Sequence, residues 1–254
     1  MNKTFQKYAR YYDLIYKDKS YAKECIFVEN LLKKYRKNKT HTVLDLACGT
    51  GGHALILRKK GYGIIGVDVS DQMISVAKEK AAKSGLDIDF KVKPMQDFTS
   101  SKKFDAVVIL FASIGYLTGR EELIKLFRNV STYLKNDGIL IFDFWNGFAV
   151  SDHYSQKRMK IVTAHDLKVR RTSSTKIDLL RHNAYITFNC LVLRTRKIIA
   201  RFNEVHKVRF FFPQEMKEIL TDSGLKLIKI HPFLTFRNQI TADDWYITAV
   251  AAKK

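Results

Sequence analysis

Residues 43–53 have the sequence VLDLACGTGGH, in which an apolar run leads directly into a group of glycines. The run at residues 43–47 is typical of a parallel strand that is covered on both faces. Glycines allow a tight turn and let the backbone approach a ligand closely. A helix is expected from His53, and its N-terminus would face that ligand. The stretch therefore predicts a strand, a turn and a helix built around a nucleotide-like ligand.

Strands and helices alternate on both sides of this stretch. Two helices are predicted within residues 4–35, where aromatic and aliphatic residues recur at helical spacing. Further strands are predicted at residues 64–68, 88–92, 104–110 and 139–144. Helices are predicted at residues 54–60, after Ser70 as an N-cap and at residues 121–134, whereas residues 135–138 (KNDG) have turn chemistry. This alternation predicts an α/β fold with a doubly wound, mostly parallel sheet.

The pattern changes after Trp145. Residues 184–192 (AYITFNCLV) alternate in polarity and favour strands, which predicts an antiparallel insertion. A helix at residues 214–223 and strands at residues 225–230 and 245–251 follow. The connection between these last strands suits an antiparallel hairpin at the edge of the sheet.

The bulk composition is that of an ordinary folded protein. The chain has 254 residues, of which 46% are hydrophobic and 28% charged. Its three cysteines are odd in number and widely spaced, which favours neither disulfides nor a zinc site and fits a reducing cytoplasm. The sequence also shows no signal-peptide core, no apolar run long enough for a bilayer and no recurring metal-ligand spacing among its histidines. We therefore expect a cytoplasmic protein without a membrane partner or a metal.

The formal net charge of +20 is the one unusual bulk property. Residues 151–213 hold 14 Lys and Arg against four Asp and Glu, so the excess is concentrated in the predicted insertion. Such a surface could face RNA, a nucleotide-activated sugar or an anionic lipid, or it could simply be solvated. Both readings stay open.

The glycines alone do not identify the ligand. Gly49, Gly51 and Ala54 fit the loose dinucleotide fingerprint G-x-G-x-x-A, which is typical of NAD-binding proteins. Asp68 ends the second strand, where a carboxylate accepts hydrogen bonds from ribose hydroxyls. A site for NAD and a site for S-adenosylmethionine would both use it in this way.

Three further features carry a family resemblance. Asp45 lies inside the strand before the glycines, residues 95–97 (MQD) follow the third strand, and the last two strands form a reversed hairpin. In these features the chain resembles the class I S-adenosylmethionine-dependent methyltransferases. Residues 12–16 (YDLIY), 48–53 (CGTGGH), 113–117 (SIGYL) and 209–213 (RFFFP) are similar to those of small-molecule N-methyltransferases, especially the amino-sugar N,N-dimethyltransferases and the glycine and sarcosine group.

The resemblance implies a Rossmann-like, seven-stranded methyltransferase core in a single domain. It divides the chain into a helical lid at residues 1–40, a cofactor-binding core at 41–150, an antiparallel β cap at 151–213 and a closing helix and β-hairpin at 214–254. The implied cofactor is S-adenosylmethionine, with Asp68 on the ribose and Asp97 on the adenine amino group. The implied cofactor-binding residues are Tyr16, Asp45, Ala47, Gly49, Gly51, Asp68, Val69, Met73, Met95, Gln96, Asp97, Phe111 and Ser113.

The reaction implied is an in-line displacement, for which an enzyme must hold donor and nucleophile close and aligned. An amine that binds uncharged needs no dedicated base, whereas a hydroxyl would benefit from one. We expect Tyr12 and His53 to line the reacting centre, and Tyr116, Trp145 and Arg209 to contact the acceptor.

A small-molecule amine, which an anionic carrier such as a nucleotide sugar could present, is the predicted acceptor. The alternatives are an RNA-associated methyltransferase or RNA-binding relative, and an NAD-dependent oxidoreductase. Residues 113–116 differ from the Asn/Asp-Pro-Pro-aromatic motif of enzymes that methylate base amino groups, which argues against that chemistry. The sequence does not indicate an oligomeric state.

Overall fold

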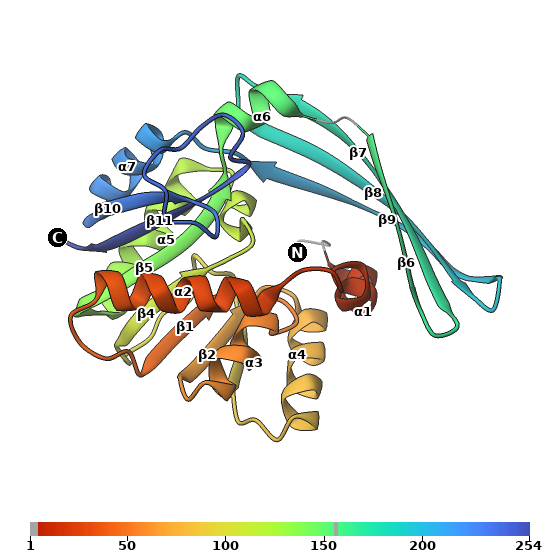
Figure 1. Ribbon diagram of the computed structural model, residues 1–254, viewed down its shortest axis with the longest axis horizontal. Coiled ribbons are helices and arrows are strands. Elements are labelled where there is room, and N and C mark those ends of the chain that lie inside the picture. The colour runs from red at the N-terminus through yellow and green to blue at the C-terminus, as the bar shows by residue number, and fades with distance from the viewer. Residues whose placement is uncertain (1–4, 155–156) are drawn as a thin grey trace.

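The computed structural model describes residues 5–154 and 157–254. Residues 1–4 of the predicted lid and residues 155–156 of the predicted cap lie outside the described residues. Figure 1 shows a layered α/β core with a long curved sheet standing beside it.

The core is built on a seven-stranded sheet with the order β10-β11-β5-β4-β1-β2-β3. Neighbouring strands from β1 to β5 are parallel, while β11 is antiparallel to both β5 and β10. Its strands are β1 (Thr42–Leu46), β2 (Gly63–Asp68), β3 (Asp89–Val92), β4 (Phe104–Ile109), β5 (Leu134–Trp145), β10 (Leu225–Pro232) and β11 (Tyr246–Lys253). The predicted Rossmann-like core and its closing antiparallel hairpin are confirmed.

Helices cover both faces of this sheet. On β1, Leu44 and Leu46 belong to a buried cluster with residues of α5 and α7, whereas Val43 belongs to a second cluster with residues of α2, α3 and α4. The apolar run of β1 follows from this burial on both faces. The helices are α2 (Tyr21–Tyr35), α3 (Gly52–Lys59), α4 (Asp71–Lys83), α5 (Arg120–Tyr133) and α7 (Pro213–Asp222). Ser70 caps α4 as predicted, since its side chain accepts a hydrogen bond from Met73 N–H.

Residues 135–138 differ from the sequence expectation. They were expected to form a turn before the strand, but β5 begins already at Leu134. The ladder with β4 passes from the pair Phe104 and Leu134 to the pair Ala106 and Ile139, so the intervening residues bulge out of register. The turn-forming residues therefore make an irregularity within a strand.

The insertion after β5 is a four-stranded antiparallel sheet with the order β6-β7-β8-β9. Its strands are β6 (Lys157–Ala164), β7 (Leu167–Asp178), β8 (Asn183–Arg194) and β9 (Lys197–Arg209), and α6 (Gly147–His153) leads into it. We call this sheet the cap. Helix α1 (Gln6–Ile15) lies between the cap and the core (Figure 1), and its Tyr8, Tyr11 and Ile15 are buried in one cluster with Val169 and Val192 of the cap.

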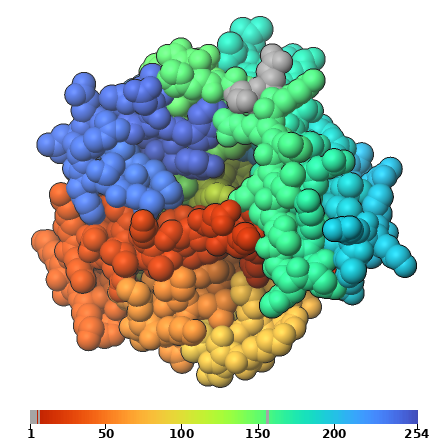
Figure 2. Space-filling model, turned by 45° about the vertical axis from the view of Figure 1, so that its right-hand side comes forward, coloured from red at the N-terminus to blue at the C-terminus, as the bar shows by residue number. Residues whose placement is uncertain are grey.

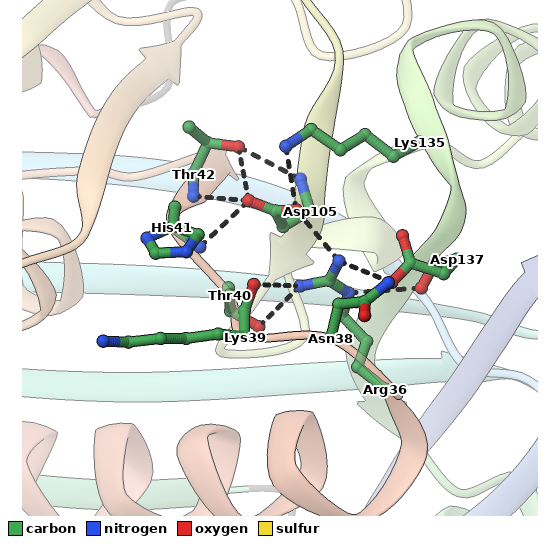
Figure 3. Close-up of polar contacts among 9 residues, drawn as sticks. All are labelled: Arg36, Asn38, Lys39, Thr40, His41, Thr42, Asp105, Lys135 and Asp137. Atoms are coloured by element: carbon green, nitrogen blue, oxygen red, sulfur yellow. Dashed lines mark hydrogen bonds and ion pairs between the residues drawn. The ribbon is translucent and has the colours of Figure 1, made fainter.

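A buried ionic network joins the elements at the amino ends of the strands (Figure 3). The Arg36 guanidinium lies 2.9 Å from Asp105 and 2.7 Å from Asp137, and it also donates to Thr40 Oγ1. Burial acts to raise the pKa of Asp105, but hydrogen bonds from the His41 and Thr42 backbone and from Lys135 outweigh it and hold this pKa well below its usual range. The network fixes the end of α2 to the start of β4.

Asp105→Asn should lower the free energy of unfolding by about 3–5 kcal/mol, because it breaks the buried ion pair with Arg36 and leaves only the partly exposed Asp137 carboxylate beside that charge. The pKa of Asp105 is depressed by folding, so its stabilisation is fully present above the unfolded value of about 3.9 and is lost as pH falls through the folded value. Urea unfolding at several pH values would measure this, and the gap between wild type and variant should narrow in acid.

Asp222→Asn is the matched control, since the Arg120–Asp222 pair is about half exposed on both sides. It should cost less than about 1 kcal/mol. Equal costs for the two variants would contradict the structural role of the network.

Candidate functional site

A pocket of about 900 Å³ lies at the carboxyl ends of β1, β2, β4 and β5. Its walls come from the core, from α1 and from the cap, and Figure 2 shows the surface hollowed where the N-terminal helices meet the green strands of the cap. The carboxyl ends of parallel strands are where open α/β sheets bind their ligands. The predicted site residues that line this pocket are Tyr12, Tyr16, Ala47, Gly49, Asp68, Val69, Met73, Met95, Gln96, Phe111, Ser113, Tyr116 and Trp145.

The glycine turn forms one end of the pocket. Ala47, Gly49 and Gly51 have φ values of 60°, 56° and 76°, a left-handed conformation that favours glycine. A Cβ built on Gly49 would meet no described atom within 4 Å, so a side chain there would project into open pocket space. Gly51 instead packs inward, where a Cβ would lie 3.2 Å from Ala77, Leu55 and Phe90, and it does not line the pocket. Gly49 therefore leaves room for a ligand, whereas Gly51 permits close packing of the turn.

Asp68 ties the turn to the end of β2. Its carboxylate accepts hydrogen bonds from Gly49 N–H at 2.8 Å and from Ser70 N–H at 2.9 Å while facing the pocket. Burial raises the pKa of Asp68, although these backbone hydrogen bonds oppose the rise. Each carboxylate oxygen keeps a further acceptor position, so the side chain can receive a pair of hydroxyl donors.

Asp45 lies behind the turn and is not part of the pocket wall. Its side chain is fully buried, and its Oδ2 has no hydrogen-bond partner among the described residues. Burial, together with the negative charge of Asp68, raises the pKa of Asp45 to about 8. The predicted direct contact between Asp45 and a ligand is therefore not supported by its position.

The end of the pocket nearest β3 is apolar. Val69, Met73 and Met95 line it together with Gln96, a set suited to a flat heterocycle. Asp97 does not join them, because its carboxylate lies 2.6 Å from the Lys125 ammonium of α5 and is 43% exposed. The expected contact of Asp97 with a ligand is thus not supported by its position, whereas the neighbouring Gln96 does line the pocket.

The segment after β4 has a constrained backbone. Phe111 and Ala112 both have positive φ, at 64° and 52°, which is uncommon for residues with side chains. Ala112 N–H donates to the buried Asp143 carboxylate at 3.1 Å, and Ser113 Oγ donates to Leu110 O at 2.7 Å. Strain of this kind gathers at ligand sites, and here it turns Phe111 and Ser113 toward the pocket.

Helix α1 closes the pocket against the cap. Tyr12 and Tyr16 line the cavity, and the Tyr16 ring packs edge-on against Phe111 with ring centroids 5.2 Å apart. Arg171 of β7 donates to Tyr16 Oη at 3.0 Å and to Tyr8 Oη at 2.7 Å. One cation of the cap thereby holds Tyr8 of α1 and Tyr16 just after it.

Known proteins match this chain in the core that carries the glycine turn and over most of its length. Residues 43–138 match the methyltransferase domain family. A dTDP-3-amino-3,4,6-trideoxy-alpha-D-glucopyranose N,N-dimethyltransferase of Streptomyces venezuelae is 27% identical over 228 residues, which cover 87% of this chain and 90% of that one. The chain is an S-adenosylmethionine-dependent methyltransferase. Its methyl donor is S-adenosylmethionine, as predicted.

Solved structures share the fold of this methyltransferase. An S-adenosylmethionine-dependent methyltransferase from Clostridium acetobutylicum superimposes with a TM-score of 0.82 at 22% identity, covering 97% of this chain and 98% of that one. SAM-bound CalS10, an amino pentose methyltransferase from Micromonospora echinaspora, gives a TM-score of 0.74 at 21% identity, covering 100% of this chain and 99% of that one. In the residues that the structure describes, no helix of the methyltransferase is long and apolar enough to span a membrane.

Two predicted residues point away from the pocket of the methyltransferase. His53 is buried and its Nε2 lies 2.7 Å from the Glu24 carboxylate, while burial lowers its pKa despite that partner. Arg209 forms an ion pair with Glu215 and donates to Thr118 O at 3.0 Å. The predicted placement of His53 at the reacting centre, and of Arg209 against an acceptor, is corrected by these partners.

Several pocket residues escaped the sequence analysis. Phe5 immediately precedes α1, Phe188 and His206 come from the cap, and Tyr246 comes from β11. His206 could have been found from period-two alternation, because residues 204, 206 and 208 share one face of β9. No local signal marks Phe5 or Tyr246, since only the packing of distant segments brings them to the pocket.

Asp68→Ala should weaken binding of S-adenosylhomocysteine to the methyltransferase by about 1–3 kcal/mol, because hydrogen bonds to a buried carboxylate would be lost. Isothermal titration calorimetry measures this directly, with a thermal melt to show that the variant is folded. Asp97→Ala, which removes an acid outside the pocket wall, is the matched control and should leave the affinity nearly unchanged. The reverse order of effects would contradict the site as placed here.

Proposed function

We propose that this methyltransferase transfers the methyl group of S-adenosylmethionine to the amine nitrogen of a small molecule. The observation that carries this proposal is the chemistry of the pocket wall. None of the described residues that line it is Lys or Arg, whereas Asp68, Asp71 and Glu122 are acidic. The wall also carries a set of aromatic rings, from Phe5, Tyr12, Tyr16, Phe111, Tyr116, Trp145, Phe188 and Tyr246.

Such a wall favours positive charge throughout the reaction. Aromatic faces attract cations, and this attraction is strongest where water is excluded. The donor enters with a positive sulfonium, which supplies the methyl group. An amine acceptor carries that charge away as an alkylammonium, so a cation stays in the pocket from start to finish. A hydroxyl acceptor would lose its proton and end as a neutral product, which a wall of acids and aromatic rings stabilises less well than a cation.

The residues of the chain divide the pocket between the two substrates. We propose that Asp68 holds the ribose hydroxyls, that the backbone around Gly49 contacts the methionyl part, and that Met73, Met95 and Gln96 enclose the adenine. The acceptor would then lie toward Tyr116 and the cap. This division rests on the wall described above and on the resemblance in sequence.

The activities for which the relatives are named support an amino sugar as the acceptor. The enzyme of Streptomyces venezuelae is named for N,N-dimethylation of an amino sugar linked to dTDP, and so is a relative from Streptomyces fradiae. These names also favour a nucleotide carrier, which stays a prediction because no Lys or Arg is among the described residues that line the pocket. The cytoplasmic location also stays a prediction. Neither RNA nor NAD draws support from the pocket or the relatives, and neither is proposed.

The test is methylation by the purified protein of dTDP-3-amino-3,6-dideoxy-α-D-glucopyranose, compared with the same sugar nucleotide carrying a hydroxyl in place of the amine. We expect methyl incorporation, measured by mass spectrometry, into the amine and not into the hydroxyl compound. The free amino sugar tests the carrier: a much lower kcat/KM for it would support recognition of the nucleotide. Methylation confined to hydroxyl compounds would overturn the proposal.

A further inference from the structure

Three polar side chains form a continuous path from the pocket wall into the cap. Tyr116 Oη lies 2.7 Å from His206 Nδ1, and His206 Nε2 lies 3.2 Å from a Glu204 oxygen. Tyr116 belongs to the 3₁₀ helix η1 (Ser113–Tyr116) after β4, whereas His206 and Glu204 both belong to β9. Tyr116 and His206 line the pocket, and Glu204 lies behind them with a side chain only 7% exposed.

The partners fix which atom holds each proton. An ionised Glu204 can only accept, so the N–H of neutral His206 is on Nε2 and its lone pair is on Nδ1. Tyr116 must then donate its hydroxyl proton to Nδ1. Burial raises the pKa of Tyr116 well above its ordinary value, which keeps the phenol protonated. The oxygen of Tyr116 still offers a lone pair toward the pocket.

An amine acceptor presents a problem that this path can solve. In neutral water an alkylamine is mostly an ammonium ion, which has no lone pair with which to attack a methyl group. One proton must leave the nitrogen before transfer. The pocket wall otherwise offers acids that would hold the ammonium as a cation, whereas the imidazole of His206 has a ring nitrogen, Nδ1, that can accept a proton.

We propose that Tyr116, His206 and Glu204 form a proton relay that deprotonates the acceptor ammonium. This inference rests on the amine methylation proposed above. The ammonium proton passes to Tyr116 Oη as the phenol proton passes to His206 Nδ1, which leaves a neutral amine and an imidazolium facing the Glu204 carboxylate. The nitrogen lone pair then forms the new C–N bond while the C–S bond of the donor breaks and its electron pair stays on sulfur. After product release, His206 returns one proton to solvent.

The surroundings of His206 suit a transient cation. Aromatic rings face it from three segments: Phe5 just before α1 at 4.9 Å, Phe188 of β8 at 4.8 Å and Tyr116 of η1 at 5.9 Å between ring centroids. The charged and titratable groups around it are Glu204 on its own strand, Tyr8 of α1, and Arg171 of β7, which lies over the Phe188 ring.

Glu204 also connects the relay to α1. Its carboxylate accepts hydrogen bonds from Phe5 N–H at 2.8 Å and from Tyr8 N–H at 3.3 Å, at the start of that helix. The N-terminal end of a helix stabilises a negative charge. The helix that closes the pocket therefore also orients the carboxylate behind His206, so Glu204 is a positioning residue and Tyr116 is the catalytic one.

The test compares the pH dependence of kcat/KM in His206→Gln, Tyr116→Phe and wild type, with dTDP-3-amino-3,6-dideoxy-α-D-glucopyranose as the acceptor. Glutamine can keep the hydrogen bonds to Tyr116 and Glu204 but cannot take up a proton. At about pH 7 both variants should lose about 100-fold or more, the usual contribution of general acid–base catalysis. The loss should shrink about tenfold per pH unit and vanish above the pKa of the amine, where the acceptor is already neutral.

His165→Gln is the matched control, since His165 lies exposed in the turn between β6 and β7 of the same cap. It should follow the wild-type profile. The affinity of each variant for S-adenosylhomocysteine should stay within about twofold of wild type, which separates loss of the relay from loss of the fold. Tyr116→Phe removes a single oxygen and keeps the test available should the glutamine variant fail to fold.

A loss that is the same at every pH would overturn the relay, because His206 and Tyr116 would then only shape the pocket. Amine methylation by wild type would still stand in that case. If wild type methylates none of the amines offered, the proposed function itself fails, and the relay falls with it. The two failures are thus told apart by the wild-type reaction alone.

Discussion

The hydrogen bonds of Asp68 are the constraint on which the site depends. They join Gly49, just past β1, to Ser70, just before α4, through one carboxylate at the end of β2. Without them the left-handed turn would lose its tie to the neighbouring strand, and the start of α4 would lose its link to the same point. The buried Asp68 carboxylate thus fixes the glycine turn that forms one end of the pocket, and it also fixes the start of α4.

Sequence patterns were informative where a residue's place follows from its own strand or turn. Strand β1, its glycine turn and Asp68 could be predicted, because burial on both faces and a strand end are local properties. Asp97, His53 and Arg209 could not be placed, since Lys125, Glu24 and Glu215 decide where their side chains point. Each of these side chains could turn toward the pocket or toward a charged neighbour on another element. Only the packed fold shows which neighbour lies within reach.

The cap shows the same limit at the level of a sheet. Its strands were evident from alternating polarity, but the face that turns toward the core depends on how α1 and η1 dock against it. Glu204, His206 and Val208 become pocket or near-pocket residues only because this face of β9 meets both elements. Residues 135–138 show a related limit, since their turn-forming sequence marks a break of register within β5 and not the boundary before that strand.

The basic charge of the chain and the chemistry of its pocket act in different places. Arg170 and Arg201 of the cap are exposed, while the described residues of the pocket wall include acids and aromatic rings but neither Lys nor Arg. A permanent cation in the pocket wall would oppose both a sulfonium and an ammonium, so the reacting centre favours the exclusion of Lys and Arg. A positive outer field attracts anions at longer range. The basic surface would therefore attract the anionic carrier of such an acceptor, and the pocket would stabilise its cationic amine.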